Sequence, residues 1–336
     1  MQISFRTNAG GENGWGNLIR LYNLYLYLYK IKPDYNYLFI IEGDEEIFKY
    51  LSRKKVKFLK LKNKISINNE KIILNKIKEK NYLICEMLDL SYERQIMYKK
   101  LYKKVIVFDD LINQKYAADY VICAQEWPSY NNTKISDKNT KFLLGYDYFI
   151  FNKNYKKYNE IRIKKKLKSK IKSIVVILGG SDYEIAYMKV AQALKKFNKN
   201  IKILFIIGFS QIKKNKKTIK SILPNAKIIS NVSDVSKYIY KADVAIVGGG
   251  YTKIEAAYLL TPSIVISVQW HQLLLAKQFS KITKTLHLGY FSMIDENLIE
   301  ENLKKISLID ERIKIRNNYL KLFKNNSLEL IINKIF

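Results

Sequence analysis

Short apolar runs alternate with amphipathic segments along nearly the whole chain, and this alternation restricts the fold more than any other feature. Val244–Val247 is typical, because its four residues are all apolar and glycines follow at once. Such runs suit strands that are buried on both faces, while the amphipathic segments suit the helices that connect parallel strands. The sequence therefore predicts an α/β protein built on parallel sheets.

The expected strands form two groups. The first comprises Gln2–Arg6, Tyr37–Ile41, Val56–Leu59, Tyr82–Cys85, Val105–Phe108, Tyr120–Cys123 and Phe142–Leu144. The second comprises Ile174–Leu178, Ile203–Ile207, Lys227–Ser230, Val244–Val247, Ser263–Val268 and Leu286–Gly289. A chain of 336 residues is also too long for one typical core. We expect two Rossmann-like domains that face each other across a cleft.

The expected domain boundaries follow from these groups. Residues 1–151 form the first domain, and residues 152–172, which are strongly basic and hold no strand pattern, read as a linker. Residues 173–310 form the second domain. Two helices are expected near the end, over 295–306 and 311–325, and the region 311–336 could cross back to the first domain.

The formal charge of +30 is carried almost wholly by lysine, since arginine occurs at seven positions. The lysines are spread along the chain, which is typical of solvated faces, and reading of bases or bidentate binding of phosphate favours arginine. We therefore expect no nucleic-acid partner. A peripheral association with anionic lipid stays open as an alternative. The sequence does not indicate an oligomeric state.

The cysteines and the hydropathy pattern indicate a cytoplasmic protein. Cys85 and Cys123 lie in predicted apolar strands without a CxxC partner, so we expect reduced core residues. No apolar run approaches the roughly 18 residues of a membrane-spanning helix. The first residues already read as a strand, so no secretion signal is expected.

A triple-glycine turn, Gly248–Gly250, follows the strand Val244–Val247 and precedes a helix that opens near Thr252. Ligands of α/β sheets bind where strands end, and a glycine turn lets backbone amides approach an anion. Glu255, one turn into the helix, could accept a hydrogen bond from a sugar hydroxyl. The alternative is an ordinary strand–turn–helix unit in which the glycines only relieve crowding.

A second glycine-rich loop, residues 7–17, joins the first strand to the first helix. A loop in that position faces the ligand crevice of an α/β domain. We expect it on the substrate side of the site.

The chain resembles the GT-B nucleotide-sugar enzymes, in particular the UDP-sugar hydrolase of pseudaminic acid biosynthesis and the MurG-type N-acetylglucosaminyltransferases. The resemblance follows the chain in order and rests on the segments Arg6-Thr7-Asn8, Gly14-Trp15-Gly16-Asn17 with Arg20, Phe108-Asp109-Asp110, Gly145-Tyr146-Asp147-Tyr148, Gly179-Gly180-Ser181-Asp182 and Gly249 to Glu255 with Gln272.

The resemblance implies two groups of binding residues. Those on the nucleotide side are Gly179, Gly180, Ser181, Gly249, Gly250, Thr252, Glu255, His271 and Gln272. Those on the substrate side are Arg6, Asn8, Gly14, Gly16, Arg20 and Tyr148. Amides and helix ends can carry the charge of a diphosphate, so we expect no metal and no cofactor besides the UDP-sugar substrate.

Three positions depart from the family pattern. The family histidine that would activate water is Asn17 here, and an amide cannot take a proton near neutral pH. The Asp of the family's Arg-x-Asp is Asn8, and its Asp-His-Tyr appears as Glu86-Met87-Leu88. These changes together indicate altered chemistry on the acceptor side.

Other side chains could replace the missing base. Asp109, Asp110 and Glu86 follow or end first-domain strands, and burial could raise the pKa of one of them. Asp109 could equally cap the following turn. His271 is expected to orient its loop or contact the diphosphate, and His287 to be structural. The candidate catalytic residues are therefore Asn17, Asp109, Asp110 and Glu86.

Three functions fit this sequence. The first is a hydrolase that cleaves the anomeric carbon–phosphate bond of a UDP-amino sugar. The second is an inverting glycosyltransferase that moves the sugar to a glycan or lipid acceptor. The third is a nucleotide-sugar-binding protein that has lost catalysis.

Overall fold

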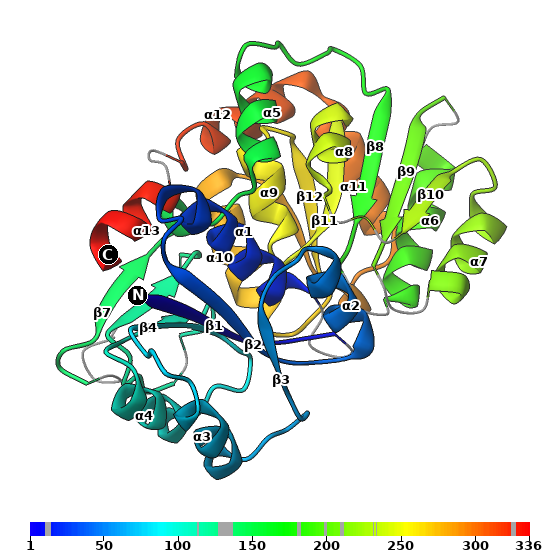
Figure 1. Cartoon of the computed structure of the whole chain (residues 1–336). Helices are drawn as coiled ribbons and strands as arrows, with labels where there is room; N and C mark the ends of the chain where they lie inside the picture. The colour runs from blue at the N-terminus through cyan, green and yellow to red at the C-terminus, as the bar shows by residue number, and fades with distance from the viewer. Residues whose placement is uncertain are drawn as a thin grey trace. The chain divides into compact units, whose positions relative to one another are not determined.

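The computed structural model describes residues 1–10, 15–112, 114–126, 137–179, 183–197, 200–208, 212–230, 232, 234–323 and 327–336. It divides the chain into two compact units (Figure 1). The first contains Met1–Ile150 together with Asn325–Phe336, and the second contains Phe151–Lys324. Gly14, Gly180 and Ser181, which sequence analysis selects, lie outside the described residues.

A seven-stranded parallel sheet forms the centre of the first unit, in the order β3-β2-β1-β4-β5-β6-β7. Its strands are β1 (Gln2–Ala9), β2 (Asn36–Gly43), β3 (Phe58–Leu61), β4 (Tyr82–Glu86), β5 (Lys104–Phe108), β6 (Tyr120–Cys123) and β7 (Lys141–Leu144). The strand order reverses at β1, which lies between β2 and β4. Residues at the carboxyl ends of β1 and β4 therefore flank the point where such sheets open a crevice.

The helices of the first unit are α1 (Gly16–Ile31), α2 (Glu45–Arg53), α3 (Ile67–Asn75), α4 (Tyr92–Leu101) and α13 (Ser327–Ile335), with the 3-10 helix η3 (Tyr146–Tyr148). Local sequence sets several starts. Asp44, Ser66 and Ser91 each accept a hydrogen bond from the third residue beyond them, as N-cap residues do. α13 belongs to this unit because Ile331, Ile332 and Ile335 pack in the same core as Ile3 and Phe5.

A six-stranded parallel sheet forms the centre of the second unit, in the order β10-β9-β8-β11-β12-β13. Its strands are β8 (Ser173–Ile177), β9 (Lys202–Ile207), β10 (Lys227–Ser230), β11 (Val244–Gly248), β12 (Ser263–Ser267) and β13 (Leu286–Tyr290). β11 and β12 are buried along their whole length, which explains their unbroken apolar sequences. Here the order reverses at β8, between β9 and β11.

The helices of the second unit are α5 (Lys153–Ile163), α6 (Glu184–Phe197), α7 (Ile212–Ile222), α8 (Ser236–Lys241), α9 (Thr252–Tyr258), α10 (Gln272–Thr283), α11 (Glu296–Ser307) and α12 (Ile309–Tyr319), with η4 (Phe291–Met293). Two of them differ from the sequence expectation. Residues 152–172, read as a linker, contain α5, whose Tyr155 packs into the core of this unit. The single helix expected over 311–325 is instead α12, and a separate α13 follows.

A buried ion-pair network holds the first sheet to α3 and α4. Arg6, on β1, is fully buried and pairs with Glu42 of β2 and with Glu70 of α3, whose Oε1 lies 2.6 Å from Nε of Arg6. Glu70 also pairs with Arg94 and accepts a hydrogen bond from Tyr98 at 2.8 Å. Buried charges need such partners, because desolvating a single unpaired one is costly. The network therefore assigns Arg6 an internal role, with no exposed surface for a ligand.

We predict that Glu70→Gln lowers the free energy of unfolding of the first unit by about 3 kcal/mol, because the charges of Arg6 and Arg94 lose their shared carboxylate. Urea unfolding followed by circular dichroism measures the change. Glu45→Gln is the matched control, since Glu45 pairs with Lys60 at 3.6 Å on the exposed surface, where such pairs contribute about 1 kcal/mol at most. Equal effects of the two substitutions would contradict the prediction.

Candidate functional site

The glycine turn lies where sequence analysis expects it, at the carboxyl end of β11 and beside the end of β8. A Cβ on Gly248 would lie 2.3 Å from the carbonyl oxygen of Leu178, and one on Gly249 would lie 2.9 Å from Oγ of Ser267. These two glycines therefore do relieve crowding between strand ends. Gly250 is partly exposed, and a Cβ there would lie 3.2 Å from Nε2 of Gln272. Only a glycine turn fits this close packing.

Glu255 lies on α9, one turn beyond Thr252, and is held by a residue that sequence analysis did not select. The hydroxyl of Tyr155, on α5, donates a 2.5 Å hydrogen bond to Oε1 of Glu255. Burial raises the pKa of Tyr155 well above its usual value, and Glu255 adds to this, so Tyr155 remains a donor. No hydrogen bond to Oε2 of Glu255 is seen from the described residues. That oxygen can accept from a ligand hydroxyl.

The environment of Glu255 changes its acidity. Burial raises the pKa of Glu255 to about 7, the hydrogen bond from Tyr155 opposes this rise, and the nearby charge of Asp234 adds to it. Asp234 is itself bonded to Asn154 Nδ2 at 2.6 Å. Near neutral pH both the neutral and the ionised form of the Glu255 carboxyl are therefore populated.

The start of α10 closes one side of the glycine turn. Gln272 Oε1 accepts a hydrogen bond from the amide of Val268 at 3.2 Å, which fixes the loop between β12 and α10. Burial lowers the pKa of His271, and the positive charge of Lys253 lowers it further. His271 is thus neutral near neutral pH and can act as a hydrogen-bond donor or acceptor. His287 lies 2.9 Å from Oγ of Ser267, a structural contact.

Gly179 and Thr252 complete the described part of this site. Gly179 follows β8 with a φ of +132°, a conformation that side chains rarely adopt. Thr252 is the first residue of α9 and is partly exposed. Gly179, Gly250 and Thr252 are partly exposed, whereas Leu178, Gly248 and Gly249 before them are buried.

In the first unit, polar side chains gather at the reversal point of the sheet. Arg20, on α1, donates to both carboxylate oxygens of Glu86 at the end of β4, at 2.5 to 3.0 Å, and lies 3.1 Å from Oδ2 of Asp110. Asp110 also accepts from the amide of Ala124. The arginine thereby joins α1 to the ends of two strands, and both carboxylates are engaged in this internal contact.

Asp109 shows the capping role that sequence analysis gave as its alternative. Its oxygens accept hydrogen bonds from the amide of Leu111, the side-chain amide of Gln114 and the hydroxyl of Tyr116, at 2.7 to 3.0 Å. These contacts organise the turn after β5. A proton acceptor with this many structural partners is poorly placed to serve as a base.

Two asparagines keep buried polar atoms without partners. Asn8 follows Thr7, the β1 residue that pairs with Glu86 of β4, and donates through Nδ2 to Asp89 at 2.9 Å. Its Oδ1 is buried and has no partner among the residues that the structure describes. The Nδ2 of Asn17, in the first turn of α1, is also buried and unpaired among the described residues. Buried polar groups normally have partners. A ligand hydroxyl would supply them.

The remaining substrate-side candidates have structural contacts. Gly16 begins α1. Tyr148, in η3, is partly buried and packs against the core of the first unit, and burial raises its pKa. Sequence analysis missed Tyr155 and Asp234. Tyr155 lies in the segment read as a linker, so no signal in the pattern marked it.

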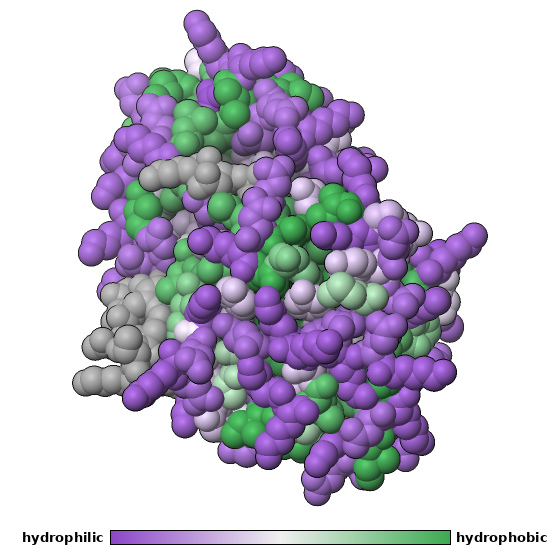
Figure 2. Space-filling model, turned by 60° about the vertical axis from the view of Figure 1, so that its left-hand side comes forward, coloured by the Kyte–Doolittle hydropathy of each residue, from purple (hydrophilic) through white to green (hydrophobic). Residues whose placement is uncertain are grey.

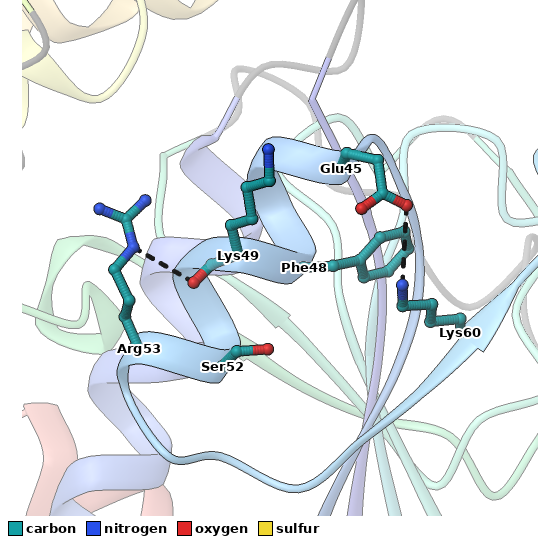
Figure 3. Close-up of a pocket in the computed structure, with 6 residues that line it drawn as sticks. All are labelled: Glu45, Phe48, Lys49, Ser52, Arg53 and Lys60. Carbon is teal, nitrogen blue, oxygen red and sulfur yellow. Dashed lines mark hydrogen bonds and ion pairs between the residues drawn. The ribbon is translucent and has the colours of Figure 1, made fainter.

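A separate pocket of about 440 Å³ lies on α2 and β3 (Figure 3). Its lining consists of Glu45, Phe48, Lys49, Ser52, Arg53 and Lys60, and includes none of the residues that sequence analysis selects. Lys60 pairs with Glu45 and lies over the ring of Phe48, 4.4 Å from its centre. These exposed side chains bind one another, so we do not assign the function there.

Two further observations concern the described residues. They include no group of three or more histidine, cysteine, aspartate or glutamate side chains that could hold a metal ion. They also include no helix both long and apolar enough to cross a membrane. On the face in Figure 2, hydrophilic residues cover most of the surface and hydrophobic ones form separate groups.

We predict that Glu255 titrates near pH 7 and that Tyr155→Phe raises its pKa further, because the lost hydrogen bond favours the ionised form. Carbon NMR of labelled glutamate carboxyls measures both values. Since the folded-state pKa lies above the usual 4.5, the contribution of Glu255 to stability is lost as pH rises from about 4.5 to about 7. Glu255→Gln removes that loss.

Tyr258→Phe is the control, because Tyr258 lies on the same helix and stacks on Phe151 with ring centres 3.9 Å apart. It leaves the titration of Glu255 unchanged. A wild-type value near 4.5 would contradict the prediction.

The fold and parts of the sequence match known proteins. Over 99% of the chain it superimposes on 99% of the UDP-GlcNAc 2-epimerase from Neisseria meningitidis, solved with UDP-GlcNAc, with a TM-score of 0.64 at 12% identity. MurG of Acinetobacter baumannii gives a TM-score of 0.68 at 12% identity over 100% of this chain and 99% of that one. The two sheets and these likenesses confirm the expected GT-B fold.

Two curated relatives match in sequence. The spore coat polysaccharide biosynthesis protein SpsG of Bacillus subtilis is 24% identical over 94% of this chain and 92% of its own. An uncharacterized protein of Methanocaldococcus jannaschii is 26% identical over 79% of this chain, and the match spans 55% of that protein's length. The model of the lipid-A-disaccharide synthetase family matches residues 150–329, more than half of the 336 residues. The chain therefore belongs to the lipid-A-disaccharide synthetase family.

Proposed function

We propose that the protein binds a UDP-amino sugar through its second unit and releases UDP by breaking the bond between the anomeric carbon and the phosphate oxygen. The observation that carries this proposal is Glu255, one turn into the helix that follows the glycine turn, whose Oε1 is held by Tyr155 while no hydrogen bond to its Oε2 is seen among the described residues. A carboxylate in that position can accept hydrogen bonds from the ribose. Gly250 and its neighbours can receive the diphosphate.

The leaving group requires charge stabilisation at the moment of bond cleavage. The electron pair of the broken bond goes to the β-phosphate oxygen of UDP, and backbone amides at the glycine turn can stabilise that charge without a metal. Among the structural neighbours, the epimerase was solved with a UDP-sugar bound, which supports the choice of nucleotide.

We place transfer to a hydroxyl acceptor before transfer to water. The family is named for a disaccharide synthetase, and Asn17 cannot act as the base that would activate water. The unpaired Oδ1 of Asn8 and Nδ2 of Asn17 suit a hydroxyl, which both donates and accepts hydrogen bonds. The acceptor oxygen attacks the anomeric carbon as the bond to the β-phosphate oxygen breaks, and its proton passes to solvent. We propose a glycan or lipid of the cell surface as the acceptor class.

Hydrolysis is the second candidate. The sequence resemblance to the UDP-sugar hydrolase of pseudaminic acid biosynthesis favours it, since that resemblance extends over both halves of the chain. In that case water replaces the hydroxyl acceptor, and the product is the free amino sugar.

We predict that the protein releases UDP from at least one UDP-amino sugar. If the protein is a transferase, this release depends on an added acceptor. A coupled assay for UDP, run over a panel of UDP-sugars with and without hydroxyl acceptors, measures both. Acceptor-independent release identifies the hydrolase. Thermal stabilisation by UDP-sugars without any UDP release would instead indicate a binding protein and contradict the enzymatic proposal.

Glu255→Ala tests the nucleotide site, and Glu45→Ala is its control. Glu255→Ala removes the ribose acceptor, so nucleotide binding and UDP release are lost together. Glu45→Ala, at the pocket on α2, leaves both unchanged. Unchanged nucleotide binding in Glu255→Ala would remove the assignment of the nucleotide site.

We predict that Asn17→His raises the rate of UDP-sugar hydrolysis by about 100-fold or more, the usual contribution of a general base. The imidazole would supply the missing proton acceptor in the first turn of α1. Hydrolysis is measured as UDP release without acceptor, and Asn17→Gln, which keeps the amide, is the matched control. Equal rates in the two variants would show that the loop does not present this residue to the substrate.

A further inference from the structure

Lys253, the second residue of α9, is buried to an unusual degree. Its exposed fraction is 0%, and among the lysines that the structure describes it alone is fully buried. Lysine carries a strongly hydrated ammonium group, so burying it is costly unless the charge has partners. Its full burial therefore requires a local explanation.

Two carbonyl groups of the glycine turn bind the ammonium. Nζ of Lys253 donates to the carbonyl oxygen of Gly249 at 2.7 Å and to that of Gly250 at 3.1 Å. It also lies 5.7 Å from the centre of the Phe279 ring. The side chain therefore reaches back beneath the turn and holds both carbonyls toward the interior.

These contacts fix the direction of two backbone amides. Peptide bonds are planar, and none in the described part of the chain is cis, so each N–H there points opposite to the carbonyl of the same peptide group. The carbonyls of Gly249 and Gly250 share their peptide groups with the N–H of Gly250 and of Tyr251. Holding the carbonyls inward therefore turns these two N–H groups away from Lys253, toward the edge of the sheet.

The lysine also adds positive charge to this region. Burial lowers the pKa of both His271 and His287, and the charge of Lys253 lowers both further, with Lys277 contributing at His287, so both stay neutral near neutral pH. An anion at the turn then meets the field of Lys253 rather than that of an imidazolium. In the low-dielectric interior this field is screened less than at the surface.

We propose that Lys253 is a positioning residue for the diphosphate: it orients the amides of Gly250 and Tyr251 toward the anion and adds a buried positive charge behind them. The inference rests on the proposed function, because the anion is the diphosphate of the UDP-sugar. It extends that function to a residue that the sequence pattern did not mark.

The test compares ligands with and without phosphate. Isothermal titration calorimetry of the full-length protein with UDP, UMP, uridine and inorganic pyrophosphate measures each affinity. Lys253→Met keeps the length of the side chain but removes its charge and its donors. We expect it to weaken UDP and pyrophosphate binding about tenfold or more, since charge-assisted hydrogen bonds are the strong ones. Uridine binding stays within about twofold.

Lys189→Met is the matched control. Nζ of Lys189 also donates to two backbone carbonyls in the second unit, those of Phe291 at 3.1 Å and Ile294 at 2.8 Å, but not at the glycine turn. We expect it to leave all four affinities unchanged. Lys253→Gln keeps a hydrogen-bond donor group without the charge, so it separates the contribution of the hydrogen bonds from that of the charge.

A second measurement covers the case in which Lys253→Met folds poorly. Proton NMR titration of His271 and His287 in Lys253→Gln reports the removed charge directly, and both pKa values rise. Equal losses for uridine and UDP, or no loss for UDP, would overturn the inference while leaving the proposed function intact. The wild type could instead bind pyrophosphate but not UDP, with pyrophosphate binding lost in Lys253→Met. That result would contradict the proposed function and support the anion site at Lys253. A wild type that binds neither overturns both.

Discussion

Parallel pairing of the strands is the constraint on which the rest of this protein depends. In each parallel sheet the carboxyl ends of all strands lie at the same edge, so residues that are far apart in sequence lie close together there. The order reverses at β1 in one sheet and at β8 in the other, and ligands of such sheets bind at the point of reversal. Asn8, Glu86 and Asp110 meet at the first reversal, and the glycine turn lies at the second.

The two edges handle charge in opposite ways. At the first, the single positive charge of Arg20 is shared by Glu86 and Asp110, and Oδ1 of Asn8 and Nδ2 of Asn17 have no partner among the described residues. At the second, a lysine lies beneath the backbone and a carboxyl of raised pKa lies beside it. The proposed function assigns hydroxyl groups to the first edge and the diphosphate to the second.

The strands could be predicted from the sequence wherever burial dictates an apolar run, as in β11 and β12. The glycine turn could be predicted because it directly follows such a run. Helix α5 could not be predicted, because its lysines and asparagines are typical of a solvent-exposed linker. Its buried residue is Tyr155. Arg6 looked like a ligand residue because the sequence cannot show that Glu42 and Glu70, distant along the chain, lie beside it. Lys253 was hidden among many surface lysines, since only the folded turn shows what its ammonium binds.

The place of α13 has a consequence for how this chain is made. Ile331, Ile332 and Ile335 complete the core that contains Ile3 and Phe5, and Lys104 donates to the carbonyl of Ile335 at 2.8 Å. During synthesis the second unit is therefore fully translated before the first can bury its core completely. The first unit must wait in a partly open state, with apolar surface exposed to chaperones, while the unit that follows it has all the residues it needs to fold.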